Sequence, residues 1–345
     1  MSLRGRLALF IALGHSTRVI AVEHRSSWPR RAEIKEVFMR AVTLFSLLLG
    51  AAVGCSAPAP TFHSIGVGGS TGAGGSTGAG ASGGNLGLGG NLGLGGGGAG
   101  VTCPVEATLV YVVSDDDKSL YSFYPPTLAF TKVGVLVCEP GTAPFAMSVA
   151  RDGTAWVLYD DGKIFRVSTT DASCTPTAFV PGQHGFTGFG MGFSADAPGS
   201  TAETLFGCWM TGLARIDPAT LTLTPVGTVP GLDVSSGCDL TGTGNGDLFA
   251  FVPQHTQWVL AQLDKTTSAP TWSHVLTPPI PTGGAWGTSF WGGDLYLYTT
   301  PLGQQHSSVW RYRPSDQTTV MLVADVGFQI VGAGESTCVP LTPPK

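Results

Sequence analysis

From Val101 onward, short apolar runs alternate with breaks of Gly, Asp and Pro. In residues 150–167, ARDGTAWVLYDDGKIFRV, an Asp-Gly pair precedes each of two apolar runs. Runs of this length bounded by turn residues predict antiparallel strands joined by tight turns. Helical periodicity is hard to find anywhere after Cys55, so the pattern predicts an all-β domain.

A unit of 43 to 50 residues repeats five times in this part of the chain. Each unit has an aromatic residue within an apolar run, and a polar residue flanked by apolar ones follows 9 to 15 residues later. The aromatic residues are Tyr111, Trp156, Phe206, Phe249 and Tyr296, and the polar ones are Ser122, Arg166, Arg215, Gln262 and Arg311. A period of this length is typical of propellers and solenoids.

Each unit has room for four strands, predicted in the second unit at 145–150, 155–159, 163–168 and 174–180. Five such sheets must bury their apolar faces against one another, and radial closure does this while protecting the edges. Residues 101–345 are therefore predicted to form a five-bladed β-propeller. The first unit lacks an innermost strand before Thr108, and a lone strand at 329–337 is predicted to supply it and close the ring.

The string LARIDPATL, Leu213 to Leu221, resembles the strand-turn-strand element common in bacterial propeller families with YVTN-type or lactonase-like repeats. The resemblance extends over the repeated part of the chain at the level of the repeat. Since the motif is structural, it implies the propeller fold and leaves the activity open.

Six cysteines remain after Cys55, an even number that suits disulfides in an exported protein. Six cysteines allow 15 pairings. Placement in the repeat favours three bonds, Cys103 with Cys338, Cys138 with Cys174, and Cys208 with Cys238. A zinc site is the weaker interpretation, because no pair has the usual ligand spacing.

The N-terminal part predicts lipidation. Residues 41–53 form an apolar stretch too short to cross a bilayer as a helix and suited to a signal peptide. Small residues precede Cys55, as in bacterial lipoprotein signals, so residues 39–54 are interpreted as the signal and Cys55 as the lipidated residue. Residues 1–38 are interpreted as an upstream extension, the alternative being a long basic n-region. Ser56 after the lipid cysteine favours the outer membrane.

Residues 55–100 are predicted to be a flexible tether. Between Gly66 and Gly100 the chain has 19 glycines in 35 residues, including two tandem duplications, GGSTGA and GGNLGL. No core can form from this composition. A phosphate-binding loop is disfavoured because no Gly-Lys-Ser/Thr ends the stretch.

Charge argues against nucleic acid as a partner. Residues 1–40 hold 8 of the 18 Lys and Arg and 3 of the 23 Asp and Glu, so the remainder carries 10 against 20, a formal net charge of −10. Binding to nucleic acid draws on clustered positive charge, which this composition does not supply.

Chemistry is sought first on the innermost strands, which line the channel of a propeller. The candidates there are Ser148, Met191, Asp239, Ser289 and Glu335. Asp239 and Glu335 could form a carboxylate pair of the kind that glycosidases use, or simply hydrogen-bonded linings of the channel.

Other residue types give weaker signals. The run Asp115 to Asp117 could bind calcium, but a charged hairpin turn is the favoured interpretation. Tryptophans could stack on sugars if exposed, or pack between the sheets: Trp258, Trp272, Trp286, Trp291 and Trp310. No catalytic residue, metal site or cofactor is assigned.

The sequence thus favours a monomeric, lipid-anchored propeller of the cell envelope that binds an unknown protein or glycan. The alternative is a hydrolase or lactonase using acids in the central channel.

Overall fold

The computed structural model describes residues 12–13, 16–17, 103–255, 257–281 and 283–344. The chain divides into two units, residues 1–90 and 91–345. In the first unit, the described residues form two antiparallel strands of two residues each, β1 (Ala12–Leu13) and β2 (Ser16–Thr17). The predicted signal at 39–54, the lipidated Cys55 and the tether up to residue 100 lie outside the described residues.

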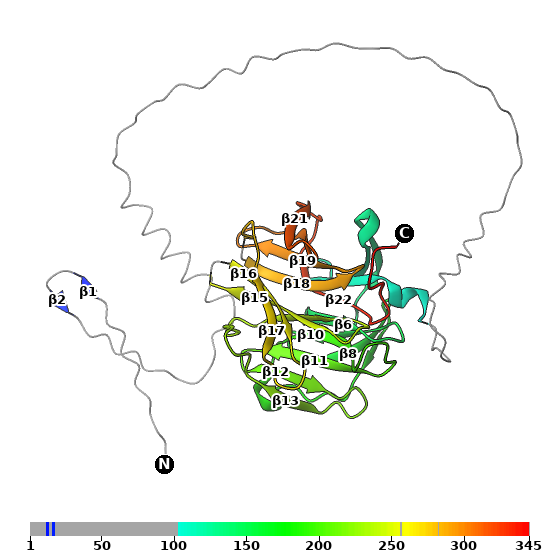
Figure 1. The fold of residues 1–345 in the computed structure, drawn as a ribbon. Helices are drawn as coiled ribbons and strands as arrows, with labels where there is room; N and C mark the ends of the chain where they lie inside the picture. Colours follow the sequence, from blue (N-terminus) through cyan, green and yellow to red (C-terminus); the bar gives the residue numbers. More distant parts are fainter. Residues whose placement is uncertain (1–11, 14–15, 18–102, 256, 282, 345) are drawn as a thin grey trace, which may run out of the picture. The chain divides into compact units, whose positions relative to one another are not determined.

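The second unit is a five-bladed β-propeller, and each blade is a four-stranded antiparallel sheet (Figure 1). Blade 1 consists of β22 (Ile330–Glu335), β3 (Val110–Ser114), β4 (Ser119–Tyr124) and β5 (Ala129–Val135). Blade 2 consists of β6 (Pro144–Val149), β7 (Thr154–Tyr159), β8 (Ile164–Ser168) and β9 (Cys174–Pro176). Blade 3 consists of β10 (Gly190–Ala195), β11 (Glu203–Trp209), β12 (Gly212–Ile216) and β13 (Leu223–Gly227).

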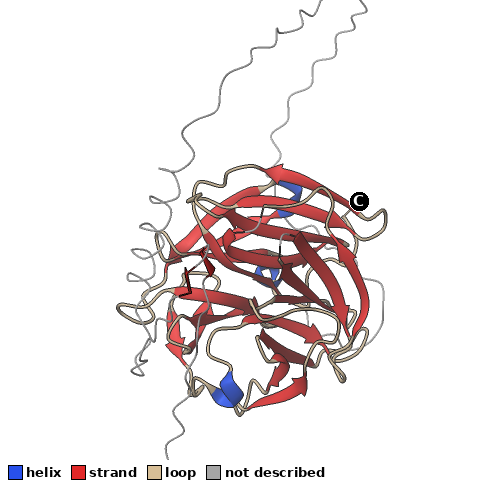
Figure 2. Cartoon of the chain, turned by 90° about the vertical axis from the view of Figure 1, so that its left-hand side faces the viewer, coloured by secondary structure: helices blue, strands red, loops and turns tan. Residues whose placement is uncertain are grey.

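Blade 4 consists of β14 (Asp239–Gly242), β15 (Leu248–Gln254), β16 (Gln257–Leu263) and β17 (Pro270–Val275). Blade 5 consists of β18 (Gly283–Trp291), β19 (Asp294–Pro301), β20 (Ser308–Arg313) and β21 (Thr318–Val323). The innermost strands contact one another in a closed cycle, β22 to β6, β10, β14, β18 and back to β22. Short 3-10 turns are the helical elements of the described residues: η1 (Val105–Thr108), η2 (Pro125–Thr127) and η3 (Gln183–Gly185) (Figure 2).

The strand register confirms the repeat read from the sequence. In every blade the aromatic residue of the second strand lies directly opposite the polar residue of the third. The five pairs are Tyr111 with Ser122, Trp156 with Arg166, Phe206 with Arg215, Phe249 with Gln262, and Tyr296 with Arg311. In blade 2 the Arg166 guanidinium lies 4.8 Å from the Trp156 ring centroid, so this pair also forms a cation–π contact.

The turn between the third and fourth strands has the same conformation in all blades. A non-glycine residue with φ between 56° and 63° occupies it in each: Leu128, Ala172, Leu221, Ser268 and Gln317. In LARIDPATL the Asp217 carboxylate accepts hydrogen bonds from the backbone N–H groups of Ala219 (2.8 Å) and Thr220 (3.1 Å). This local hydrogen bonding fixes the turn before the left-handed residue, which explains why the string recurs in degenerate form.

The ring closes with strands from both ends of the domain. β22 pairs with β3, and the hairpin between β3 and β4 holds its beginning, because Asp116 Oδ2 accepts from Gln329 N at 2.6 Å. The predicted closing strand at 329–337 is shorter in the structure. In blade 2 the fourth strand ends at Pro176 instead of residue 180, because Thr177 already turns its hydroxyl back to the carbonyl of Ile164.

Three disulfides join the six cysteines in the favoured pairs. They link Cys103 with Cys338, Cys138 with Cys174, and Cys208 with Cys238. The position of Cys238 in the repeat predicts that it lies within the first strand of the fourth unit, but it lies one residue before that strand, β14. The first bond ties the start of the described domain to the segment that follows β22.

That C-terminal segment covers one mouth of the channel. We call this side, where the turns between first and second strands lie, the sealed face. Thr337 Oγ1 accepts from Arg151 Nη1 (3.0 Å) and donates to Glu203 Oε2 (2.7 Å), and the Pro340 carbonyl accepts from Gly292 N (2.7 Å). A Cβ at Gly244 would overlap the Thr337 carbonyl. The segment therefore reaches the turns of blades 2 to 5.

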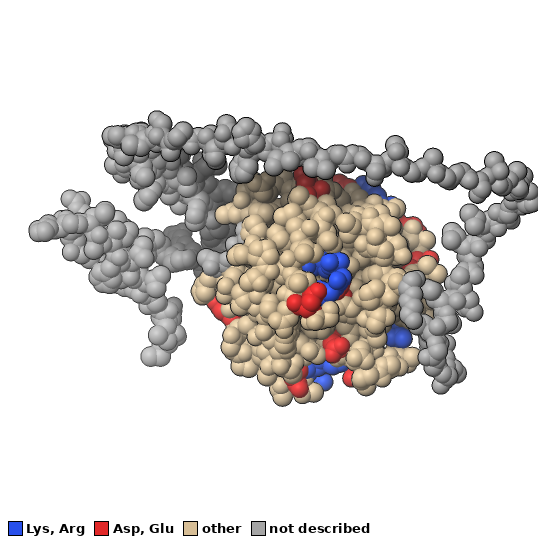
Figure 3. Space-filling view, turned by 45° about the horizontal axis from the view of Figure 1, so that its top comes forward, with Lys and Arg blue, Asp and Glu red and all other residues tan. Residues whose placement is uncertain are grey.

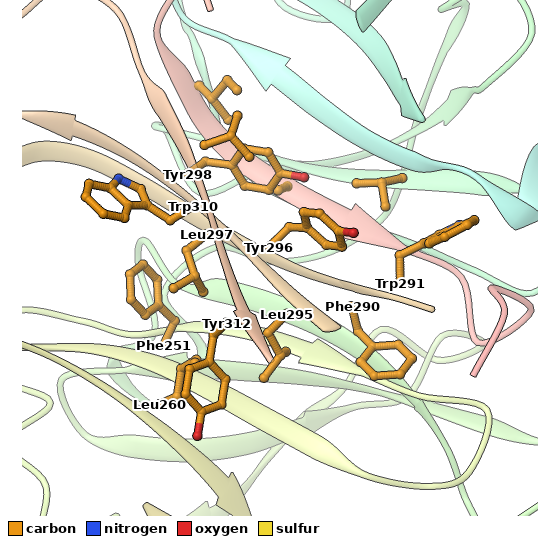
Figure 4. Close-up of a cluster of buried hydrophobic side chains, with 14 of the residues drawn as sticks. Phe251, Leu260, Phe290, Trp291, Leu295, Tyr296, Leu297, Tyr298, Trp310 and Tyr312 are labelled. Carbon is orange, nitrogen blue, oxygen red and sulfur yellow. The ribbon is translucent and has the colours of Figure 1, made fainter. Parts of the chain in front are cut away.

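The apolar faces of the blades pack into aromatic clusters between neighbouring sheets. Blades 4, 5 and 1 share the largest cluster, which includes Tyr296, Tyr298 and Trp310 (Figure 4). Trp258, Trp291 and Trp310 are buried, and Trp272 and Trp286 are partly buried against the same cluster. Most of the tryptophans thus serve as core, as the second interpretation of the sequence had it.

Candidate functional site

Asp239 begins β14 and is buried on the channel side. Its Oδ2 accepts a hydrogen bond from Thr288 N of blade 5 at 2.7 Å, whereas Oδ1 has no partner among the described residues. Burial raises the pKa of this carboxyl well above its ordinary value, and nearby backbone N–H groups offset this only in part. A Cβ at Gly190 of blade 3 would overlap this carboxyl, so three blades meet here without free space.

Glu335 ends β22 and reaches across the channel to β14. Its Oε1 accepts from the Thr241 hydroxyl, and Oε2 has no partner among the described residues. Burial is the main cause that raises the pKa of Glu335 to about 8. The Asp239 carboxyl contributes to the rise, and hydrogen bonds from the Thr241 hydroxyl and the Phe290 backbone N–H oppose it. The two acids thus form a coupled buried pair, here called the acid clasp, that joins blades 1, 4 and 5.

The other predicted channel residues also lie on innermost strands and are buried. Ser148 Oγ accepts from Phe193 N at 2.9 Å, which joins blades 2 and 3. Ser289 Oγ lies 3.0 Å from the Tyr298 hydroxyl within blade 5, and Met191 packs in the apolar cluster of blades 2 and 3. The structure brings Asp239 and Glu335 together, but none of the five side chains forms an accessible site.

Access limits what the acid clasp can do. Asp239 is 4% exposed and Glu335 is 2% exposed. On the inner strands, Cβ atoms at Gly192, Gly332 or Gly334 would press on the neighbouring strand. The backbones are packed so closely at the centre that a substrate would need the blades to separate before it could meet either carboxyl.

Three aromatic side chains lie on the face opposite the sealed face, where the innermost strands begin. Phe145 is 36% exposed, and its ring centroid lies 6.5 Å from that of Trp209, which is partly exposed. Gly188 lies beside both of these rings, and Gly237 lies beside Trp209 and Trp286. Because glycines separate the rings, these three side chains, the aromatic arc, run along the mouth from blade 2 to blade 5.

Sequence reasoning named Trp286 of the aromatic arc and missed Phe145 and Trp209. Both missed residues occupy positions that read as ordinary strand residues, Phe145 in β6 and Trp209 at the end of β11. The end of that strand is at the surface, since Met210 after Trp209 is 53% exposed, but an apolar methionine gives no sign of this in the sequence.

The run of three aspartates is a hairpin turn. Asp115 pairs with Lys118, and Asp117 Oδ2 accepts from Lys132 Nζ and from the Tyr121 hydroxyl, both at 2.8 Å. The hydrogen bonds from Lys132 and Tyr121 outweigh desolvation and hold the pKa of Asp117 at about 2. Each of the three acids bonds to the chain through one carboxylate oxygen, which fits the structural interpretation of the turn.

Within the described residues, no group of three or more His, Cys, Asp or Glu side chains could hold a metal ion. The part of the chain that the structure describes also contains no helix long and apolar enough to span a membrane.

Neither a protein-family model nor a curated protein matches the sequence. Solved structures give distant similarities. Hydrazine synthase from Kuenenia stuttgartiensis has a TM-score of 0.36 and 12% identity, over 65% of this chain and 65% of that chain. A protein of unknown function from Bacteroides thetaiotaomicron has a TM-score of 0.40 and 12% identity, over 65% of this chain and 57% of its own.

TolB from Acinetobacter baumannii has a TM-score of 0.39 and 13% identity, over 66% of this chain and 54% of that chain. This chain thus spans less than two thirds of the length of each of the three. Similarities at this level carry no argument about activity. The class of the protein, an all-β five-bladed propeller, rests on its own strand pairing.

Proposed function

We propose that the protein is an exported binding module that presents its aromatic arc to a neutral glycan. The observation that carries the proposal is the aromatic arc of Phe145, Trp209 and Trp286 at the mouth opposite the sealed face. Flat aromatic faces offer apolar contact to the C–H faces of sugar rings, and binding sites typically combine such faces with a few polar groups. The acid clasp, by contrast, is buried.

Polar groups also lie on the face that carries the aromatic arc, since Gln254 ends the second strand of blade 4. Asp233 and Gln254 join at the surface, where Gln254 Nε2 donates to the Asp233 carbonyl at 2.6 Å. Charged side chains are sparse on the face seen in Figure 3, where small acidic and basic groups are scattered over a mostly uncharged surface. A surface with few charged groups favours a neutral sugar over a charged polymer as the ligand.

The chain enters the domain on the sealed face, because Cys103 bonds to Cys338 just beyond the end of β22. The aromatic arc lies at the opposite ends of the innermost strands. A lipid on Cys55 and a tether up to residue 100 would therefore attach to the domain on the side opposite the aromatic arc and leave the arc accessible. The three disulfides support export, since such bonds persist in oxidising compartments.

The glycan proposal is tested with the purified full chain and a panel of neutral cello-, malto- and chito-oligosaccharides, followed by ligand-observed NMR. We expect at least one saccharide to bind, and Trp209→Ala to weaken it at least tenfold, since stacking one aromatic ring is worth on the order of 1 kcal/mol or more beyond its buried area. Tyr124→Ala is the matched control, because Tyr124 is 40% exposed at the end of β4 on the sealed face. The proposal is overturned if no saccharide of the panel binds, or if Trp209→Ala binds the saccharide as tightly as the wild-type protein does.

The anchor is tested separately by metabolic labelling with a fatty acid. Label is expected in the wild-type protein and not in Cys55→Ala, which is released or misprocessed. Equal label in the variant would refute lipidation at Cys55, and the proposal of glycan binding would be unaffected.

A further inference from the structure

A pocket of about 350 Å³ lies on the sealed face between blades 1 and 5. Eight of the twelve lining residues are apolar or glycine. Pro125 and Pro126 of η2 and Leu128 come from blade 1, Leu322 comes from the outermost strand of blade 5, and Pro343 and Pro344 come from the C-terminal segment. The pocket lies far from the aromatic arc, because it opens where the innermost strand β18 ends and the arc lies where β18 begins.

The polar lining of the pocket comes from β19 and β20. Asp294 is almost buried and binds Arg313 through two hydrogen bonds, from Nε and Nη2, each 3.1 Å long. These bonds raise the pKa of Arg313. Arg311, two residues earlier on the same face of β20, lies with Nε 3.6 Å from Asp294 Oδ2. One carboxylate thus faces two guanidinium groups and satisfies the hydrogen-bonding capacity of only one of them.

Arg311 and Tyr296 are left with donors for a ligand. The Arg311 guanidinium makes no hydrogen bond to any described residue, and its Nε is a buried atom without a partner. Tyr296, opposite Arg311 in the strand register, has a hydroxyl that is likewise unbonded to the described residues. Burial and the Asp294 carboxylate raise the pKa of this phenol to about 12, so it is a donor at neutral pH. In Figure 4 the Tyr296 hydroxyl lies on the side of Trp291, another lining residue.

The charge of the pocket is opposite to that of the protein. Two of the ten Lys and Arg residues after Arg40 line it with a single carboxylate, a local excess of one positive charge in a region of formal charge −10. A guanidinium with free N–H groups in a fixed fork matches the planar geometry of a carboxylate.

We propose that this pocket binds a small organic acid with one carboxylate and an apolar body. The carboxylate lies against Arg311 and accepts from the Tyr296 hydroxyl, and the body packs between the prolines and leucines of the walls. The volume is at the lower end of the range for small-molecule sites, and few polar groups line the walls, which disfavours a hydroxylated body such as a sugar acid. This site is independent of the glycan site proposed above.

The probe is hydrocinnamate, titrated into the purified full chain by calorimetry and ligand-observed NMR. We expect it to bind at least tenfold more tightly than its neutral amide, and more tightly than glucuronate, which has the carboxylate on a polar body. Arg311→Gln is expected to weaken hydrocinnamate at least tenfold, and Tyr296→Phe severalfold. Neither variant should change saccharide binding at the aromatic arc.

Arg215→Gln is the matched control, because Arg215 occupies the register position of Arg311 in blade 3 and is exposed there. It should bind hydrocinnamate like the wild type. Equal affinity for acid and amide, or unchanged binding in a folded Arg311→Gln variant, overturns the proposal. Tighter binding of glucuronate than of hydrocinnamate would overturn the assignment of an apolar body to the ligand. If saccharide binding is retained in that case, the glycan proposal still stands.

Discussion

Neutralising the acid clasp should change how the stability of the domain depends on pH. Glu335 has an ordinary pKa of 4.5 and a folded-state pKa of about 8, so the folded state keeps a proton that the unfolded state releases. The contribution of Glu335 to stability is therefore fully present below pH 4.5, falls as the pH rises, and is lost above about pH 8. At about 1.4 kcal/mol per pKa unit, the difference between these two pKa values corresponds to a loss of folding stability on the order of 5 kcal/mol. The raised pKa of Asp239 acts in the same direction.

Glu335→Gln tests this reasoning, because glutamine resembles the protonated acid and stays neutral. Urea unfolding at pH 5, 7 and 9 should show wild-type stability falling with pH and a variant profile flatter by several kcal/mol. Glu106→Gln is the control, since Glu106 is an exposed glutamate of η1 and its loss should leave the wild-type slope. Asp239→Asn should flatten the profile as well. Parallel profiles for wild type and Glu335→Gln would refute the assignment of a neutral buried pair.

Two further predictions concern ring closure. Replacing Cys103 and Cys338 together by serine opens a loop with a sequence separation of 235. The chain-entropy model gives a fall of about 5 kcal/mol in the free energy of unfolding, measured by urea denaturation under non-reducing conditions. An unchanged midpoint would mean that the bond does not constrain the unfolded chain. Truncation before Gln329 removes β22, its contact with Asp116 and the C-terminal segment at once. Because the edge of β3 is then exposed, we expect the truncated protein to aggregate, as measured by light scattering. A soluble truncation with the wild-type melting temperature would contradict closure through blade 1.

The propeller and its register were within reach of the sequence, because a structural repeat keeps the same side-chain environments at the same positions. The aromatic residues of the second strands and the polar residues of the third were aligned by pattern alone, and each pair proved to be directly opposed. Closure by the last strand followed from counting strands per unit. The favoured disulfides followed from placing cysteines in neighbouring units.

The sites depended on contacts between blades, which a repeat does not encode. Asp239 and Glu335 were predicted to lie near the channel, but only the close approach of glycine-containing backbones around them decided that they are buried. Likewise, Phe145 and Trp209 read as strand residues until the start of β6 and the end of β11 placed them at the mouth. Arg311 was recognised as a repeat position, yet its guanidinium lacks a hydrogen bond to the described residues because Asp294 is already bonded to Arg313. Local pattern thus determined the strands and their pairing, whereas burial and free hydrogen-bonding groups depend on neighbours distant in sequence, which only the closed ring brings together.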